Sequence, residues 1–194
     1  FLKYVIIFPS VQLGINAPGI SYVLSTFIYA GIFLSYSIGQ KNNIEKFVFV
    51  SSAAVYGLGN RSIFKETDPC FPVSNYALSK YWGEQQTRLY YELYNLPTTS
   101  IRFFSVYGSP QIPKKGSHSW AVAIFSMLAK KRKPITVFGD GNQIRDFTHV
   151  SDIAESVVLS IEKNSTNGKF FNSGTGKPTK VNDIVKHVFE NIEQ

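Results

Sequence analysis

The sequence predicts an α/β protein with a parallel sheet and a smaller second lobe. Two observations support this prediction. In the first part of the chain, short runs of β-branched and aromatic residues alternate with helical segments, as in consecutive βαβ units. Beyond residue 104, loops rich in Pro and Gly separate shorter elements. The chain has 194 residues, 44% of them hydrophobic, and can therefore bury a core.

Local patterns place the individual elements. Residues 4–8 form a short β-branched run bounded by Pro9, and residues 46–50 repeat this pattern before a Ser- and Ala-rich loop. A break at Pro97 precedes a third run. The expected strands are 4–8, 46–50, 98–104 and 135–138, and the expected helices are 21–39, 74–94, 119–131, 151–163 and one that begins at 181.

Charge and cysteine content limit the classes of function. The net charge is +7, and residues 130–133 form a dense basic run. No zinc-finger spacing, RNP-type aromatic stripe or basic zipper accompanies this run, so we expect a solvated surface or a phosphate-bearing small molecule rather than nucleic acid. We predict no metal site. Cys70 is the single cysteine, which fits an inert thiol in a reducing compartment. Without a signal-peptide pattern, the expected location is cytoplasmic.

One uncharged stretch leaves an alternative open. Residues 21–38 approach the length of roughly 20 residues that spans a bilayer. Their serines and the preceding Pro18 favour instead a helix that packs between a sheet and a partner subunit. We therefore expect no membrane partner, with insertion of 21–38 as the alternative.

Tyr76 and Lys80 stand one helical turn apart at the start of the helix expected at 74–94. Side chains four residues apart share a helix face, so a lysine ammonium can lie beside the phenol and favour the phenolate. Such a tyrosine could remove a proton from a hydroxyl. The same spacing occurs on many surface helices, so the pair by itself leaves a structural role open.

Two further motifs carry polar side chains that suit a ligand. Ser51 and Ser52 end the run at 46–50, at the carboxyl edge of a parallel sheet, where open α/β folds bind their ligands. Arg145 and Asp146 follow a Gly-Asp-Gly turn, and an arginine held in place is a natural diphosphate ligand. Strand-closing serines and a structural ion pair are the alternatives.

Taken together, the motifs "SSAAVYG", "YALSK", "LPTTSIRFFSVYG", "FGDGNQIRDFTHVSDI" and "KFFNSGTGKP" follow one another in a characteristic order. In this order the sequence resembles the extended short-chain dehydrogenase/reductases. Within them, it resembles the NAD-dependent nucleotide-sugar epimerase/dehydratase family typified by UDP-glucose 4-epimerase. The resemblance covers essentially the whole chain.

The resemblance implies a role for each matching residue. Tyr76 would be the catalytic base, Lys80 would lower its pKa and hold the nicotinamide ribose, and Ser52 would bond the same sugar hydroxyl. Arg145 would bind the diphosphate and Phe138 would pack on the nucleobase. The implied cofactor-binding residues are Phe8, Pro9, Ser52, Tyr76, Lys80 and Phe104. The implied substrate-binding residues are Ser52, Tyr76, Ser105, Phe138 and Arg145.

The resemblance also implies the architecture and partners. We expect the C-terminal part of a Rossmann-type sheet in residues 1–105 and a smaller α+β lobe for the nucleotide sugar in residues 106–194. The expected cofactor is NAD, with NADP open, and the substrate is a nucleotide-diphosphate sugar. We expect a homodimer through the helices at 21–39 and 75–94. The family's glycine turn is not in this sequence, so about two βαβ units, on the order of 60 residues, are expected to be missing before residue 1.

Several positions depart from the family or separate its subfamilies. Dehydratases carry an acidic pair after the catalytic serine or threonine, where this chain has Ala53 and Ala54. Epimerisation, by resemblance at C4 of a UDP-hexose, is therefore preferred to dehydration or simple reduction. Phe27 and Ser105 replace asparagines, and Pro9-Ser10 replaces a small-residue pair. The alternative is a truncated, non-catalytic relative that binds a nucleotide sugar or only dimerises.

Overall fold

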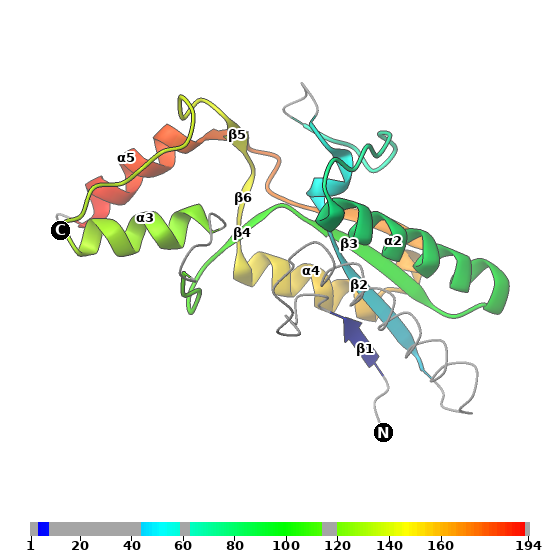
Figure 1. Ribbon diagram of the computed structural model, residues 1–194. Helices are drawn as coiled ribbons and strands as arrows, with labels where there is room; N and C mark the ends of the chain where they lie inside the picture. The colour runs from blue at the N-terminus through cyan, green and yellow to red at the C-terminus, as the bar shows by residue number, and fades with distance from the viewer. Residues whose placement is uncertain (1–3, 8–43, 59–62, 114–119, 193–194) are drawn as a thin grey trace, which may run out of the picture. The chain divides into compact units, whose positions relative to one another are not determined.

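The computed structural model describes residues 4–7, 44–58, 63–113 and 120–192 (Figure 1). The chain divides into two compact units, which we describe separately. Unit 1 comprises residues 1–60, 64–103 and 155–173. Unit 2 comprises residues 61–63, 104–154 and 174–194. The chain therefore leaves unit 1 after β3 and returns to it within a later helix.

Unit 1 is built on a parallel sheet. Its strands are β1 (Tyr4–Ile7), β2 (Lys46–Ser52), β3 (Thr98–Phe103) and β7 (Lys169–Ser173), and they pair in the order β1-β2-β3-β7 (Figure 1). Every pair in this sheet is parallel. The predicted parallel sheet is therefore confirmed, and β2 lies inside it with a neighbour on each side.

The core of unit 1 lies on both faces of β2. Phe47 and Phe49 pack with Tyr90 of helix α2 (Asn75–Tyr94), whereas Val48 packs with Ile101 and with Val157 of helix α4 (Val150–Glu162). Successive residues of a strand point to opposite faces, so the continuous apolar run of β2 serves two helices. This burial explains why β2 carries no alternating polar residues.

Helix α2 has clear physical limits and a close approach to the sheet. The Ser74 side chain accepts a hydrogen bond from the Ala77 N–H at 3.1 Å, which caps the first turn. Asn95 ends the helix in the left-handed region, with φ 53°. Gly83 faces the sheet, where an added Cβ would lie 2.7 Å from Phe49 Cε1. Only glycine lets α2 lie this close to β2.

A buried lysine, the first residue of β2, connects this strand to a later turn of the chain. Lys46 is 2% exposed, and its ammonium donates to Thr166 Oγ1 at 2.8 Å and to Asn167 Oδ1. Thr166 ends the short 3₁₀ helix η2 (Asn164–Thr166) that precedes β7. Burial lowers the pKa of Lys46 to about 8.

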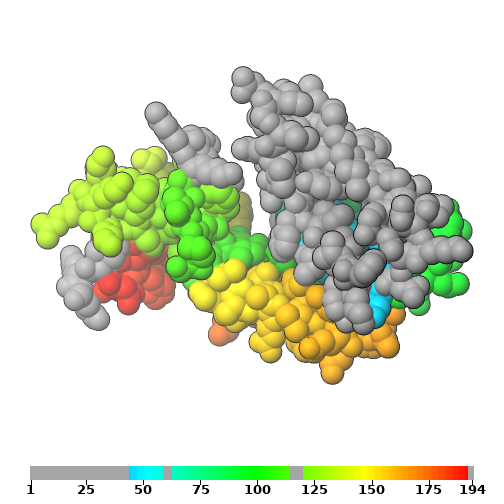
Figure 2. Space-filling view, turned by 90° about the horizontal axis from the view of Figure 1, so that it is seen from below, coloured from blue at the N-terminus to red at the C-terminus, as the bar shows by residue number. Residues whose placement is uncertain are grey.

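The described residues of unit 2 form two short strand pairs, the helices α3 (Ala121–Lys130) and α5 (Val181–Ile192), and the first turn of α4. Strand β4 (Ser105–Tyr107) pairs in parallel with β6 (Phe147–His149), and β5 (Ile144–Arg145) pairs antiparallel with β8 (Thr179–Lys180). Figures 1 and 2 show helix α3 beside helix α5 from two directions. The short strands bring 105, 145 and 179, which are far apart in sequence, into one unit.

The prediction of a strand at 135–138 is wrong. These residues are all described and form no strand, although exposed and half-buried positions alternate there. Pro134 precedes them, and Gly139 follows with φ 73°, so the chain turns before a ladder can extend. The helices at α2, α3, α4 and α5 are confirmed within one or two residues.

Other expectations fall on residues 8–43, which lie outside the described part of the chain. These are the helix at 21–39, with its membrane alternative, and the cofactor residues Phe8 and Pro9. Among the helices that are described, none combines the length and the apolar character needed to cross a bilayer. The homodimer and the cytoplasmic location stay predictions.

Candidate active site

The carboxyl end of β2 presents the first candidate residue. Ser52 is the last residue of β2, and its Oγ accepts a hydrogen bond from the Ala54 N–H at 3.2 Å. This bond caps the 3₁₀ helix η1 (Ala53–Tyr56), which turns the chain away from the strand end. A hydroxyl that accepts one bond keeps its own proton for donation. Ser52 is therefore fixed in direction and able to donate to a ligand.

Helix α2 brings Tyr76 and Lys80 together, as their spacing predicts. The Lys80 ammonium lies 5.6 Å from the centre of the Tyr76 ring and 5.6 Å from that of Phe49. It donates a hydrogen bond to the Val50 carbonyl in β2 at 2.7 Å. Lys80 is 5% exposed, whereas Tyr76 is 36% exposed. The pair thus combines a buried cation with a phenol that solvent or a ligand can reach.

Burial also changes the charge behaviour of this lysine. It lowers the pKa of Lys80 to about 7, against the opposing negative charge of Glu84 one turn along the helix. Lys80 can therefore gain or lose its proton near neutral pH. An ammonium at this place favours the phenolate form of Tyr76, and a neutral amine does not.

This shift predicts a pH-dependent stability. Between pH 7 and pH 10.5, unfolded chains hold a proton on Lys80 that folded chains lack, so the free energy of unfolding rises with pH. We expect Lys80 to contribute up to about 1.4 kcal/mol per pH unit in this range. Urea unfolding of the cofactor-free protein at pH 7, 8 and 9 measures the slope, and Lys80→Met should reduce it.

The matched control for that measurement is Lys186→Met. The Lys186 side chain is 74% exposed on α5, so its replacement should leave the slope unchanged. An identical slope in wild type and Lys80→Met would contradict the lowered pKa. Lys46, also with a lowered pKa, is present in all three proteins and cancels in the comparison.

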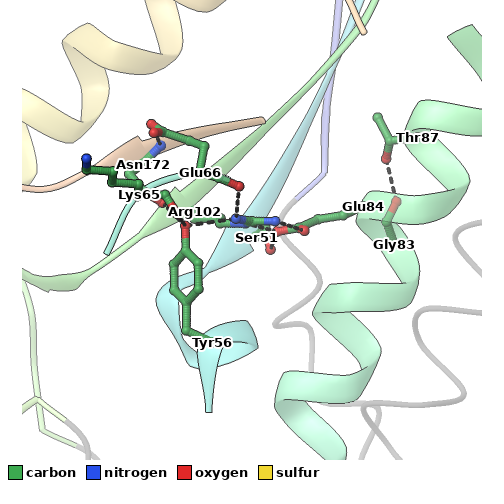
Figure 3. A network of polar contacts seen from close by, with 9 residues as sticks. All are labelled: Ser51, Tyr56, Lys65, Glu66, Gly83, Glu84, Thr87, Arg102 and Asn172. Atoms are coloured by element: carbon green, nitrogen blue, oxygen red, sulfur yellow. Dashed lines mark hydrogen bonds and ion pairs between the residues drawn. The ribbon is translucent and has the colours of Figure 1, made fainter. Parts of the chain in front are cut away.

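A buried ionic network begins at Glu84, one helical turn beyond Lys80 on α2 (Figure 3). Glu84 of α2 is fully buried and forms a bidentate ion pair with Arg102 of β3, with Nε to Oε1 at 2.8 Å and Nη2 to Oε2 at 2.7 Å. The Ser51 hydroxyl donates to Glu84 Oε1 at 2.5 Å. Three hydrogen bonds thus reach one carboxylate, and they tie α2 to the ends of β2 and β3 (Figure 3).

The network continues to the far side of Arg102. Arg102 Nη1 donates to the Tyr56 hydroxyl at 2.8 Å, and that hydroxyl donates to Asn172 Oδ1 of β7 at 2.7 Å (Figure 3). Burial alone would lower the pKa of Arg102, but the hydrogen bonds and charge of Glu84 raise it. Burial raises the pKa of Tyr56, so this phenol stays neutral. Tyr56 is thus a structural donor and not a second base.

The sequence patterns did not predict this network. A signal was present, because Arg102 lies in a strand that is otherwise buried and Glu84 lies one turn beyond Lys80 on the same helix face. Charged residues at two core positions are seldom buried unless they are paired. Sequence spacing alone, however, does not identify Glu84 as the partner of Arg102.

The remaining predicted residues that the structure describes lie in unit 2. Arg145 is exposed on β5, and its Nη1 donates to the Ile144 carbonyl at 2.8 Å. The Ser105 N–H donates to the Asp146 carbonyl at 2.9 Å, so Ser105 and Arg145 lie on segments joined by Asp146. Phe138 is 63% exposed in the preceding loop. Phe104 lies beside Gly174, where an added Cβ would meet its Cδ2 at 3.1 Å.

The chain matches one family of known proteins over most of its length. Residues 32–174 match the model of the NAD dependent epimerase/dehydratase family. The chain belongs to this family. A "Putative UDP-glucose 4-epimerase" of Methanocaldococcus jannaschii is 42% identical over 152 residues, which are 76% of this chain and 48% of that protein. The chain spans about half the length of the curated relatives it matches.

Solved structures of epimerases share the fold. The UDP-N-acetylglucosamine 4-epimerase from Methanobrevibacter ruminantium, in complex with UDP-N-acetylmuramic acid, has a TM-score of 0.86 at 27% identity and is matched over 98% of this chain and 61% of its own. UDP-glucose 4-epimerase of Thermus thermophilus, in complex with NAD, has a TM-score of 0.80 at 27% identity, over 99% of this chain and 62% of its own. The Rossmann-type α/β fold is thereby confirmed.

Proposed function

We propose that the full-length protein to which this chain belongs is an NAD-dependent epimerase that acts at C4 of a UDP-hexose. The observation that carries the proposal is the Tyr76–Lys80 pair: a buried lysine beside an accessible phenol at the carboxyl edge of a parallel sheet. Family membership supports this proposal, as do the epimerases among the relatives. The activity, the substrate and the cofactor are parts of the same proposal.

The residues of the site suit the cofactor. Ser52 ends β2, Lys80 donates to the Val50 carbonyl near the same end, and Tyr76 lies beside Lys80. Open α/β folds bind nucleotides at such strand ends. The Lys80 ammonium donates to a backbone carbonyl and has further donors for ribose hydroxyls. Phe104, directly after β3, would lie beside the nicotinamide by the family pattern. Bound NAD would supply a hydride acceptor that later returns the same hydride.

The chain's own residues would move the proton. Tyr76, as phenolate, would take the proton of the C4 hydroxyl when C4 gives up its hydride to the bound carrier, which would leave a keto sugar. Tyr76 would return the proton to the oxygen when the same hydride is delivered from the carrier to the opposite face of C4, so no net oxidation would remain. Lys80 stabilises the phenolate, and Ser52 donates a hydrogen bond to the sugar oxygen. General base catalysis of this kind contributes roughly 10² to 10⁴ in rate.

Unit 2 would bind the nucleoside diphosphate. Arg145 presents an exposed guanidinium, whose fork of donors matches diphosphate oxygens. Ser105 stands where the family has an asparagine that binds the diphosphate, and its shorter side chain offers one hydroxyl. Phe138, mostly exposed, offers a flat apolar face for a base.

The residues after Ser52 favour epimerisation over elimination. A dehydratase needs an acid to protonate the departing hydroxyl, whereas η1 begins with Ala53 and Ala54. Two methyl groups cannot transfer a proton. Reversible oxidation and reduction at one carbon needs a base, for which Tyr76 is suited, and a bound hydride carrier.

The direct test is to incubate the purified full-length protein with UDP-glucose or UDP-galactose and NAD, and to follow the products by NMR. We expect both sugars to reach the same mixture of C4 epimers. Accumulation of a 4-keto-6-deoxy sugar would show a dehydratase instead. If calorimetry detects UDP binding but no NAD binding and no product forms, the non-catalytic alternative replaces the proposal.

A further inference from the structure

Asp146 joins three separate segments of unit 2 through one residue. Its Oδ1 accepts hydrogen bonds from the Thr175 N–H at 2.9 Å and from Thr175 Oγ1 at 2.7 Å, and its Oδ2 accepts one from the Gly176 N–H at 2.7 Å. Its backbone carbonyl accepts from the Ser105 N–H at 2.9 Å. The carboxylate therefore fastens the loop at 174–176, and the carbonyl fastens the start of β4.

The fastened loop leads directly into the strand that supports Arg145. The loop runs into β8, whose Thr179 is the register partner of Arg145 in the antiparallel β5·β8 pair. The backbone of Arg145 is thus fixed from both sides: by β8 across the pair and by Asp146 as the next residue along the chain. The arginine side chain itself stays exposed.

Close packing and a second hydroxyl leave the Asp146 carboxylate little freedom. Thr148 is 2% exposed, and its Oγ1 donates to Asp146 Oδ1 at 3.2 Å. A Cβ at Gly174 would lie 2.7 Å from Asp146 Oδ2, so the carboxylate occupies the space that a side chain would take. The positions of both oxygens are fixed by neighbours on two segments.

We propose that Asp146 is the positioning residue of the nucleoside-diphosphate site: it holds Arg145 and Ser105 where both can reach one diphosphate. This inference rests on the proposed function. Arg145 and Ser105 are the ligand-binding groups, and Asp146 acts through them. Affinity for the diphosphate depends on such pre-organisation because a mobile arginine loses conformational entropy when it binds.

Because Asp146 is charged, the direction in which its neutralisation changes the affinity for the diphosphate distinguishes a positioning role from simple charge repulsion. A carboxylate next to the arginine repels an anionic ligand, so neutralising it would strengthen diphosphate binding if Asp146 had no positioning role. Loss of positioning has the opposite effect. The Asp146→Asn variant keeps the size but replaces one acceptor oxygen by an NH₂ group, which cannot accept from the Gly176 N–H.

Isothermal calorimetry of UDP with the full-length protein tests the inference. We expect Arg145→Ala to raise the Kd of UDP about 10- to 100-fold. We expect Asp146→Asn to raise it about 5- to 10-fold and to leave the Kd of NAD unchanged. In the Arg145→Ala background, Asp146→Asn should change the Kd about 2-fold or less, because Arg145, the charged group through which it acts, is gone and only the Ser105 hydroxyl remains to be positioned.

Controls separate positioning from a general loss of structure. Asp183→Asn makes the same change at an exposed position in the first turn of α5 and should leave the Kd of UDP unchanged. Thr175→Val removes one hydrogen bond to Asp146 and replaces Asp146→Asn in the test if that variant does not fold. It should also raise the Kd of UDP.

The possible binding results are distinguishable. Equal or tighter UDP binding by Asp146→Asn, or full additivity with Arg145→Ala, overturns the inference and leaves the proposed function intact. If wild type binds no UDP, the proposed function and this inference fail together.

Discussion

We expect Tyr76→Phe in the full-length protein to lower kcat for sugar interconversion by about 10² to 10⁴. The variant keeps the ring beside Lys80 and removes only the oxygen that would take the proton. The affinities for UDP and NAD should change little, because the phenol oxygen is needed in the chemical step more than in binding. Steady-state rates with a UDP-hexose, together with calorimetry of both ligands, measure the two quantities.

Tyr94→Phe is the matched control for this substitution. Tyr94 is the last residue of the same helix and is 57% exposed. Removing its hydroxyl should leave kcat unchanged. Full activity of Tyr76→Phe would exclude Tyr76 as the base, even if the protein proved to be an epimerase.

The second large effect concerns stability. We expect Glu84→Gln to lower the free energy of unfolding by about 3–5 kcal/mol. Glu84 is fully buried and Arg102 is 2% exposed, so the substitution leaves a guanidinium inside the core without its counter-charge. Chemical denaturation followed by circular dichroism measures the loss.

Two comparisons test that explanation. Glu92→Gln removes an i,i+4 pair with Arg88 whose side chains are 53% and 50% exposed, and we expect it to cost less than about 1 kcal/mol. Replacing both buried partners, Glu84→Leu with Arg102→Met, should destabilise less than Glu84→Gln alone, because neither charge of the ion pair remains in the core. A double variant as unstable as the single one would mean that packing, not the unpaired charge, sets the loss.

The parts of the fold that the sequence predicts well are those governed by local patterns. The apolar run of β2 and the capped, periodic α2 are examples, and both elements are confirmed. The pairing of Tyr76 with Lys80 follows from helix geometry alone. The proximity of their side chains in the structure needs no long-range contact to explain it.

The parts that the sequence does not predict depend on distant partners. β4, β5, β6 and β8 have two or three residues each, too few for a periodic pattern, and exist because a neighbouring segment supplies the hydrogen bonds. Residues 135–138 show the reverse case, because a strand-like run without such a partner forms no strand. The choice of Glu84 as partner of Arg102 is also tertiary, since 18 residues separate them.

The return of the chain to unit 1 affects how this protein is made. β7 and the second half of α4 add the last strand of the described sheet and one side of the core around Val48, but they are synthesised after residues 104–154 of unit 2. Once β3 has been synthesised, the proposed base and its lysine are already part of the chain. The edge of β3 that pairs with β7 has no partner until β7 is synthesised. Translation at about 5–20 residues per second makes this interval several seconds. During that time β3 is an unpaired strand edge, the kind of surface that chaperones protect.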